Sequence, residues 1–344
     1  MARQTRLRFL VGFGVAAVII FLFVYAIGWD EVVSTLSKTD LGVFSLGLVS
    51  SFVCLVAWSA VWNRVLSVID HALSRGRITL IFLSAMFANY VTPLGQVGGE
   101  PFIAYVLSKS SDIDYEHSLA AVMTSDFLNL IPFFSYAVVG FSYFVTRRSF
   151  NSDVRNYAAV FVVVAAVAVS AALFIWHRRD LVESFVLRVA GFLRKTVGKL
   201  SSNLRTALRE EDVKERIDGF FETLDLFSEN RREMATAVVF SHIGWFFFIL
   251  PLYTSFLSLG YDVPLGTTLL IIPVSGLAGF IPLPGGLGGV EIAIAVTIFS
   301  LTGLSLPAAS AAALLYRLCV YWFTILVGGI SSMYLSVDLR RIET

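Results

Sequence analysis

Residues 282–291 read P-L-P-G-G-L-G-G-V-E, a loop rich in glycine and proline between the short apolar stretches 266–281 and 290–302. Neither stretch is long enough to span a bilayer comfortably, because a transmembrane helix needs about 20 mostly apolar residues. Within lipid, irregular backbone persists only where protein or a water-filled cavity satisfies its polar groups. This loop is therefore expected to lie inside a helical bundle and not against acyl chains.

A similar loop occurs 191 residues earlier in the chain. Residues 92–100 read T-P-L-G-Q-V-G-G-E and separate the short apolar stretches 78–91 and 101–107. A match between two such loops at a fixed offset predicts an internal repeat. The aligned pairs are Pro93 with Pro284, Gly95 with Gly286, Gly98 with Gly289, and Glu100 with Glu291.

The repeat extends beyond the two loops. The same offset carries the long apolar stretch 117–145 onto the final one, 307–335, and aligns Asp126 with Arg317. Each unit thus contains a short helix, a Gly/Pro loop with a carboxylate, a second short helix, and a long span with one charge. This shared layout makes a chance match of the loops less plausible.

The composition excludes most soluble classes of protein. Hydrophobic residues make up 57% of the chain and charged residues only 15%, whereas a soluble domain has roughly 25% charged residues. This excludes a soluble globular enzyme and a disordered protein. The 26 Lys and Arg against 25 Asp and Glu leave no excess to attract a phosphate backbone, so no nucleic-acid partner is expected. The remaining class is a polytopic membrane protein.

Long apolar stretches predict six full transmembrane helices and an all-α fold. The first stretch follows three arginines, as the core of a signal peptide would. Its apolar run is too long for a signal peptide and no small-residue cleavage site follows it, so we expect a retained span. The six predicted spans are 9–27, 41–62, 117–145, 156–176, 235–257 and 307–335.

The distribution of Lys and Arg orients the chain, because cytoplasmic loops carry an excess of both. If 78–109 and 266–302 are re-entrant hairpins, both termini and the stretch 177–234, with its twelve Lys and Arg, lie in the cytoplasm. Only loop 146–155 disagrees. If both segments instead cross the membrane fully, 177–234 lies outside, which fits much less well. We therefore expect six full spans plus two re-entrant hairpins in the cell membrane.

Under this topology the two hairpins enter from opposite sides, so the repeats are inverted. Inverted repeats are common in transporters, whose substrate sites lie near the bilayer midplane between discontinuous helices. The chain is expected to form a single membrane domain, 1–344. Repeat one (about 78–145) and repeat two (about 266–335) are joined through spans 156–176 and 235–257 and an amphipathic cytoplasmic connector, 177–234.

The two loops supply groups that suit an anionic ligand. A half-helix that starts after a Gly/Pro break points free N–H groups into the protein, and these favour an anion such as phosphate. Glu100 and Glu291 stand at the two helix starts. There they either cap the helices or receive an amine, a sugar hydroxyl or a proton. The paired breaks are therefore the predicted site.

Four charged side chains fall within the predicted membrane segments. A charge at the bilayer centre costs about 2.5–3.5 kcal/mol on insertion scales, so such a residue faces a cavity or a partner. One interpretation is an ion pair of Arg317 with Asp126 or with a glutamate. The other is a ligand or proton site, and the two overlap because a ligand can compete for one member of a pair. The predicted substrate-binding residues are Arg317, Glu100, Glu291, Asp126, Gly98, Gly99, Gly288, Gly289, Asn89 and Gln96.

The sequence contains no motif that points to catalysis. Its two cysteines, Cys54 and Cys319, lie in apolar stretches and indicate neither a disulfide framework nor a zinc site. It lacks a G-x-S-x-G elbow, an H-E-x-x-H motif and a kinase signature, and 285–289 lacks the Lys-Ser/Thr of a nucleotide-binding loop. We expect no enzyme activity, no metal and no cofactor.

The block at 282–291, followed by a span with a lone arginine in Leu315-Tyr316-Arg317, resembles the signature of the lysylphosphatidylglycerol synthase transmembrane region. The resemblance to this flippase-like family covers about 9–336. It implies the flippase part only. In the multiple peptide resistance factors such a region moves aminoacylated phosphatidylglycerol between leaflets, while a separate soluble domain, for which this chain has no room, makes the lipid. Family members often carry an arginine where this chain has Asp126, which leaves the headgroup preference open.

Together these features predict a flippase- or scramblase-like translocase for an anionic lipid headgroup, whether plain, aminoacylated or glycosylated. The phosphate would lie near Arg317, with the carboxylates toward an attached amine or sugar, or taking up a proton. One alternative is a proton- or ion-coupled small-solute transporter that uses the same polar cavity. Another is an accessory subunit whose partner is a lipid- or glycan-modifying enzyme.

Overall fold

The computed structural model is all helical over the residues that it describes, and no strand occurs among them. The predicted spans 9–27 and 156–176 lie mostly outside these residues, as do Gln96, Gly98 and Gly99. The described residues are 18, 21–26, 28–68, 73–91, 100–111, 113–147, 163, 167, 170, 174, 178–196, 209–276 and 284–342.

Within this part of the chain, four helical stretches are long and apolar enough to cross a membrane. They confirm the four predicted spans that fall there, and the chain is a multi-pass membrane protein. The last span is composite, because α13 continues through a π-helical turn into α14. The long helices are α2 (Leu41–Leu66), α5 (Tyr115–Arg147), α10 (Arg231–Ser258), α13 (Leu306–Arg317) and α14 (Phe323–Ile342).

Prolines inside the long helices are compensated by neighbouring helices. Pro251 in α10 leaves the carbonyl of Phe247 without its helical donor, and Ser50 Oγ of α2 donates to that oxygen at 2.8 Å. Near Pro132 in α5, Ser241 Oγ of α10 donates to Asn129 Oδ1 at 2.6 Å and lies 3.4 Å from the carbonyl of Leu128, the oxygen that Pro132 leaves without its helical donor. Such hydrogen bonds let proline persist in a transmembrane helix, and here they tie α2, α5 and α10 together.

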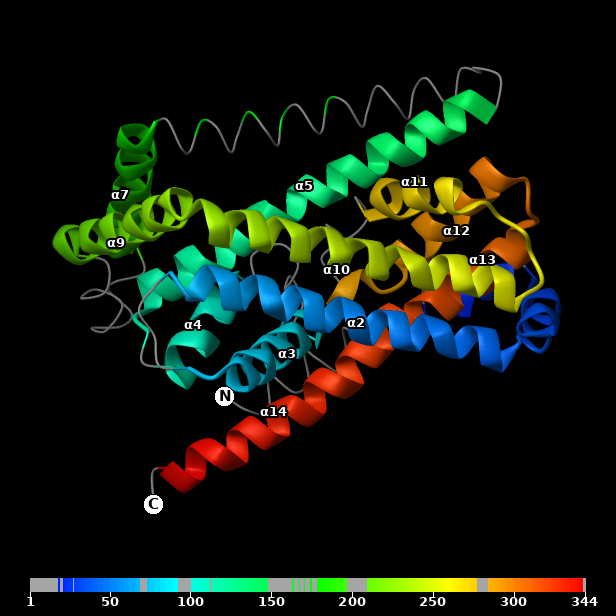
Figure 1. Cartoon of the computed structure of the whole chain (residues 1–344), viewed down its shortest axis with the longest axis horizontal. Coiled ribbons are helices and arrows are strands. Elements are labelled where there is room, and N and C mark those ends of the chain that lie inside the picture. Colours follow the sequence, from blue (N-terminus) through cyan, green and yellow to red (C-terminus); the bar gives the residue numbers. More distant parts are fainter. Residues whose placement is uncertain are drawn as a thin grey trace.

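Two pairs of shorter helices flank the two loops. α3 (Arg75–Val91) and α4 (Glu100–Ser110) flank the first, and α11 (Leu265–Gly276) and α12 (Gly289–Thr302) flank the second. α11 has 12 residues and α12 has 14, so they rise about 18 and 21 Å, short of about 30 Å of hydrocarbon. In Figure 1, α11 and α12 lie toward the end of the bundle where α10 finishes, and α3 and α4 toward the end where it begins.

The helices pack in a reciprocal pattern. α2 and α10 lie side by side along their length (Figure 1). α3, which precedes the first loop, packs on α14, whereas α11, which precedes the second loop, packs on α5. α4 in turn packs on α5, and α12 on α13. The first helix of each short pair therefore contacts the long helix that follows the other loop.

Glycine allows close backbone contact at both reciprocal interfaces. A Cβ atom at Gly140 of α5 would lie 2.5 Å from the backbone nitrogen of Leu270 in α11. A Cβ atom at Gly328 of α14 would lie 2.5 Å from the carbonyl oxygen of Leu83 in α3. Small residues permit such approach between membrane helices, whose association depends on close packing. The two glycines thus set the spacing of α5 from α11 and of α14 from α3.

Two helices make up the described part of the connector, α7 (Arg179–Thr196) and α9 (Glu210–Glu229). They pack on each other at one end of the long helices (Figure 1). Arg179 donates to both carboxylate oxygens of Asp225, at 2.7 and 2.6 Å. These hydrogen bonds lower the pKa of the Asp225 carboxyl below its usual value. The contact is therefore intact at neutral pH and is lost as the pH falls through that lowered pKa.

Gly140→Ala and Gly328→Ala are each expected to destabilise the protein, because the added methyl group meets backbone that cannot rotate away. Overpacking of this kind costs roughly 1–3 kcal/mol. The midpoint of thermal unfolding, measured by size-exclusion chromatography of heated samples in detergent, should fall by several degrees.

Gly191→Ala in α7 is the matched control, since a Cβ atom there meets nothing within 4 Å. It should unfold at or slightly above the wild-type temperature, because alanine is the better helix former. Unchanged unfolding temperatures in all three variants would contradict the close contacts of α5 with α11 and of α14 with α3.

Candidate functional site

Arg317 and Glu291 form a buried ion pair inside the bundle. Arg317 Nε donates to Glu291 Oε1 at 2.7 Å, and the two side chains are only 7% and 2% exposed. Arg317 Nη2 also donates to the carbonyl of Gly285 at 2.8 Å, and Glu291 Oε2 accepts from the backbone N–H of Gly288 at 2.6 Å. The pair thus joins the end of α13 to the second loop and to the first turn of α12.

The second loop owes its path to glycine. Gly285, Gly286 and Gly288 have φ angles of 55°, 64° and 85°, in a region that residues with a Cβ atom rarely adopt. A Cβ atom at Gly285 would also collide with the ring of Tyr321. The loop can therefore turn sharply, bring its carbonyl to Arg317, and still pack beneath an aromatic ring.

A π-helical turn brings Arg317 and Tyr321 together. Residues Leu318–Trp322 form this turn, a feature that often marks functional sites. The guanidinium carbon lies 4.3 Å from the centroid of the Tyr321 ring, a cation–π contact. Tyr321 Oη donates to the carbonyl of Tyr90 at 3.3 Å. Because Tyr90 precedes the first loop, the final span contacts both loop regions.

A cavity of about 280 Å³ lies beside Arg317. Two polar atoms on its lining residues are buried and have no hydrogen-bond partner among the described residues: Ser275 Oγ and Trp245 Nε1. Buried polar atoms are nearly always paired, so these two are available to a ligand or to water. The lining comes from α3, α5, α10, α11, α12, α13 and the π-helical turn: Tyr90, Phe133, Trp245, Phe248, Ile272, Ser275, Gly276, Val290, Ile294, Tyr316, Arg317 and Val320.

The four predicted charges divide into two groups. Arg317 contacts Glu291, whereas Asp126 of α5 is exposed at the helix surface and lies within electrostatic range of Glu100 at the start of α4. Among the described residues, neither Asp126 nor Glu100 forms a hydrogen bond or ion pair with Arg317. Of the two ion pairs considered from the sequence, the structure contains the one with a glutamate.

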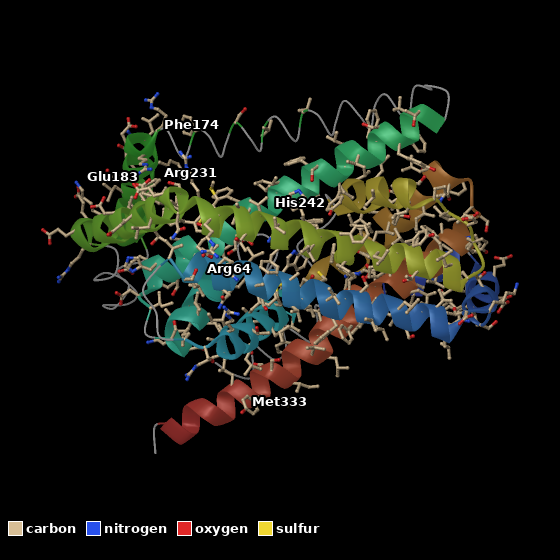
Figure 2. The ribbon with its side chains drawn as sticks, in the orientation of Figure 1. Arg64, Phe174, Glu183, Arg231, His242 and Met333 are labelled. Carbon is tan, nitrogen blue, oxygen red and sulfur yellow. The ribbon has the colours of Figure 1, made fainter. Side chains whose placement is uncertain are left out.

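The remaining predicted site residues lie in different parts of the structure. Gly288 and Gly289 stand at the start of α12, beside the ion pair. Asn89 lies in α3, where its Oδ1 is buried and has no partner within the described part of the chain. His242 of α10 (Figure 2), which was not among the predicted site residues, hydrogen-bonds with the Val238 carbonyl and with Ser135 inside the bundle and does not line the cavity.

The sequence did not identify Trp245, Ser275 and Tyr90 as site residues. Trp245 and Tyr90 lie in apolar helices, where an aromatic side chain usually indicates packing. Ser275 did carry a weak signal, because it is a polar residue at the end of a nearly apolar helix, next to the Gly/Pro loop.

Known proteins resemble this chain over nearly its whole length. The family model for the lysylphosphatidylglycerol synthase TM region matches residues 9–328, which include both loops. Two proteins of Methanothermobacter thermautotrophicus are each named UPF0104 membrane protein. One is 25% identical to this chain, over 96% of this chain and 94% of its own length. The other is 26% identical, over 93% of this chain and 92% of its own length. UPF0104 membrane protein MJ1595 of Methanocaldococcus jannaschii is 25% identical over 94% of this chain and 95% of its own.

Glu291→Gln is expected to destabilise the protein strongly, because it leaves the buried guanidinium without its counter-charge. Removing one partner of a buried pair costs about 3–5 kcal/mol. The yield of folded protein and its unfolding midpoint in detergent should both fall.

The double variant Glu291→Gln with Arg317→Met removes both charges and should regain most of that stability. Should the double variant prove as unstable as the single one, the cost would come from lost packing and not from an unbalanced charge.

Proposed function

The chain belongs to the family of the lysylphosphatidylglycerol synthase TM region, and on this premise we propose that it is a lipid translocase of flippase or scramblase type. It carries an anionic lipid headgroup between the leaflets of the cell membrane. One observation carries the proposal: the guanidinium of Arg317 is buried within a multi-pass bundle and lines a cavity together with polar atoms that have no partner in the described part of the chain. Polar groups at such depth are costly and typically line substrate paths.

The charge arrangement favours an anion in the cavity. Arg317 lines the cavity and Glu291 does not, so the positive end of the pair is nearer to a ligand. An anion about 4 Å from the guanidinium and about 8 Å from the carboxylate would gain about 4 and lose about 2 kcal/mol, at an effective dielectric constant of about 20. The neutral pair therefore still attracts a phosphate.

The helix boundaries and contacts support an inverted repeat. α5 begins at Tyr115 and α13 at Leu306, 191 residues later, and α2 begins at Leu41 and α10 at Arg231, 190 residues later. The reciprocal contacts of α3 with α14 and of α11 with α5 are those expected of a two-fold arrangement. On this proposal α3–α4 and α11–α12 are re-entrant hairpins from opposite sides. Motion of one unit against the other would expose the cavity to each leaflet in turn.

The orientation follows from the charges of the connector. With twelve Lys and Arg in 177–234, the positive-inside rule places α7, α9 and both termini in the cytoplasm. The proposed role is transport and not catalysis.

Arg317→Lys is expected to slow transport at least about tenfold, because lysine keeps the charge but lacks the planar fork that contacts Glu291 and Gly285 together. A hydrogen bond to a charged group contributes about 1.5–3 kcal/mol. Losing one such bond therefore corresponds to a decrease in rate of at least about tenfold. The assay is leaflet-resolved transport of fluorescent phosphatidylglycerol in proteoliposomes.

Arg64→Lys is the matched control. Arg64 also pairs with a glutamate, Glu233, at 3.2 Å. It lies near the end of α2 (Figure 2) and does not line the cavity. Its variant should transport at the wild-type rate. A full rate for Arg317→Lys would argue against the proposed role, as would a wild-type protein that moves no lipid. Coupled uptake of a small solute, or activity only with a copurifying enzyme, would identify the alternatives.

A further inference from the structure

We infer that the cavity beside Arg317 selects headgroups that accept hydrogen bonds and carry no positive charge, such as phosphoglycerol, over aminoacylated ones. The inference rests on the proposed function, because it names the substrate class of the same site. The family's name alone suggests a lysine-bearing lipid. The chemistry of the cavity argues for the opposite preference.

The charge that faces the cavity is positive. Among the described residues, the ionisable side chains of the lining are Arg317, Tyr90 and Tyr316, and no carboxylate belongs to it. A headgroup ammonium would therefore lie beside a guanidinium without a negative group to receive it. In surroundings of low dielectric constant the resulting repulsion is much stronger than in water.

Glu291 does not supply the missing carboxylate. Both of its oxygens are engaged within the protein, Oε1 with Arg317 Nε and Oε2 with the backbone N–H of Gly288. Its side chain is 2% exposed and does not line the cavity. Glu291 thus holds Arg317 and the loop in place and leaves the cavity side of the pair positive.

The polar atoms of the lining that have no partner among the described residues are hydrogen-bond donors. Trp245 Nε1 can only donate a hydrogen bond, and the hydroxyl of Ser275 can donate one as well. Ser275 is 3% exposed. Arg317 has five N–H groups; two donate to Glu291 and Gly285, and the others have no partner within the described part of the chain. These donors suit a ligand with several acceptor atoms, as in a phosphodiester with glycerol hydroxyls.

The size of the cavity restricts this selection to the headgroup. A volume of about 280 Å³ equals roughly nine waters at about 30 Å³ each. Such a space holds a phosphate with a small polar substituent and not two acyl chains. The acyl chains must stay outside, so discrimination depends on the headgroup.

The test is equilibrium binding to the purified full chain by calorimetry, with dihexanoyl phosphatidylglycerol and its lysyl ester as the two probes. Wild type should bind phosphatidylglycerol at least about tenfold more tightly than the lysyl ester. Trp245→Phe keeps the ring and removes the N–H donor, so it should weaken phosphatidylglycerol binding severalfold. Ser275→Ala is a second variant with the same expected direction.

Ser118→Ala is the matched control for Ser275→Ala. Ser118 Oγ in α5 is also buried without a hydrogen-bond partner among the described residues, but Ser118 does not line the cavity, so its variant should bind as wild type does. Equal or tighter binding of the lysyl ester would overturn the inference, and so would binding that neither Trp245→Phe nor Ser275→Ala weakens. If the expected binding preference is found but no lipid moves in proteoliposomes, the proposed function is wrong and the inference on binding holds. If the lysyl ester is the lipid transported, the proposed function holds and the inference is wrong.

Discussion

The buried pair of Glu291 and Arg317 is the interaction on which the irregular second loop depends. Taking two charges out of water costs several kcal/mol for each ion, and mutual attraction offsets this only with good geometry and further hydrogen bonds. Those bonds come from the Gly285 carbonyl and the Gly288 N–H, and the Tyr321 ring covers the guanidinium. The loop, the start of α12 and the π-helical turn must therefore be in place together. The pair in turn stabilises the non-helical backbone of the second loop inside the bundle.

Reciprocal packing links this centre to the rest of the bundle. α3 rests on α14 and α11 rests on α5, with Gly328 and Gly140 allowing close backbone contact. Tyr321 adds a direct connection, because its hydroxyl reaches the Tyr90 carbonyl just before the first loop. A shift of one short helix pair would thus change the surroundings of Arg317 through α14 and through Tyr321. Such coupling suits the proposed translocation, in which the cavity faces the two leaflets in turn.

Hydropathy and the positions of Gly and Pro were enough to predict the four long spans that fall within the described residues, the short helices and the loop with its glutamate. They could not choose between Asp126 and a glutamate as the partner of Arg317, because the spacing of residues in the sequence does not give the distance between their side chains in the fold. The packing of α12 on α13 decides it. Trp245 and Ser275 were not predicted, because the cavity exists only once α10 and α11 converge beside Arg317. In sequence, an aromatic residue in an apolar helix looks the same whether it packs or lines a cavity.

The most direct measurement is photo-crosslinking of phosphatidylglycerol that carries a diazirine on its headgroup, in nanodiscs, with adducts mapped by mass spectrometry. A headgroup that enters the bundle should label cavity residues such as Trp245, Ile272 and Val290, and labelling should fall when unlabelled phosphatidylglycerol competes. Adducts confined to outward-facing residues such as Phe52 and Val138 would contradict a headgroup site beside Arg317.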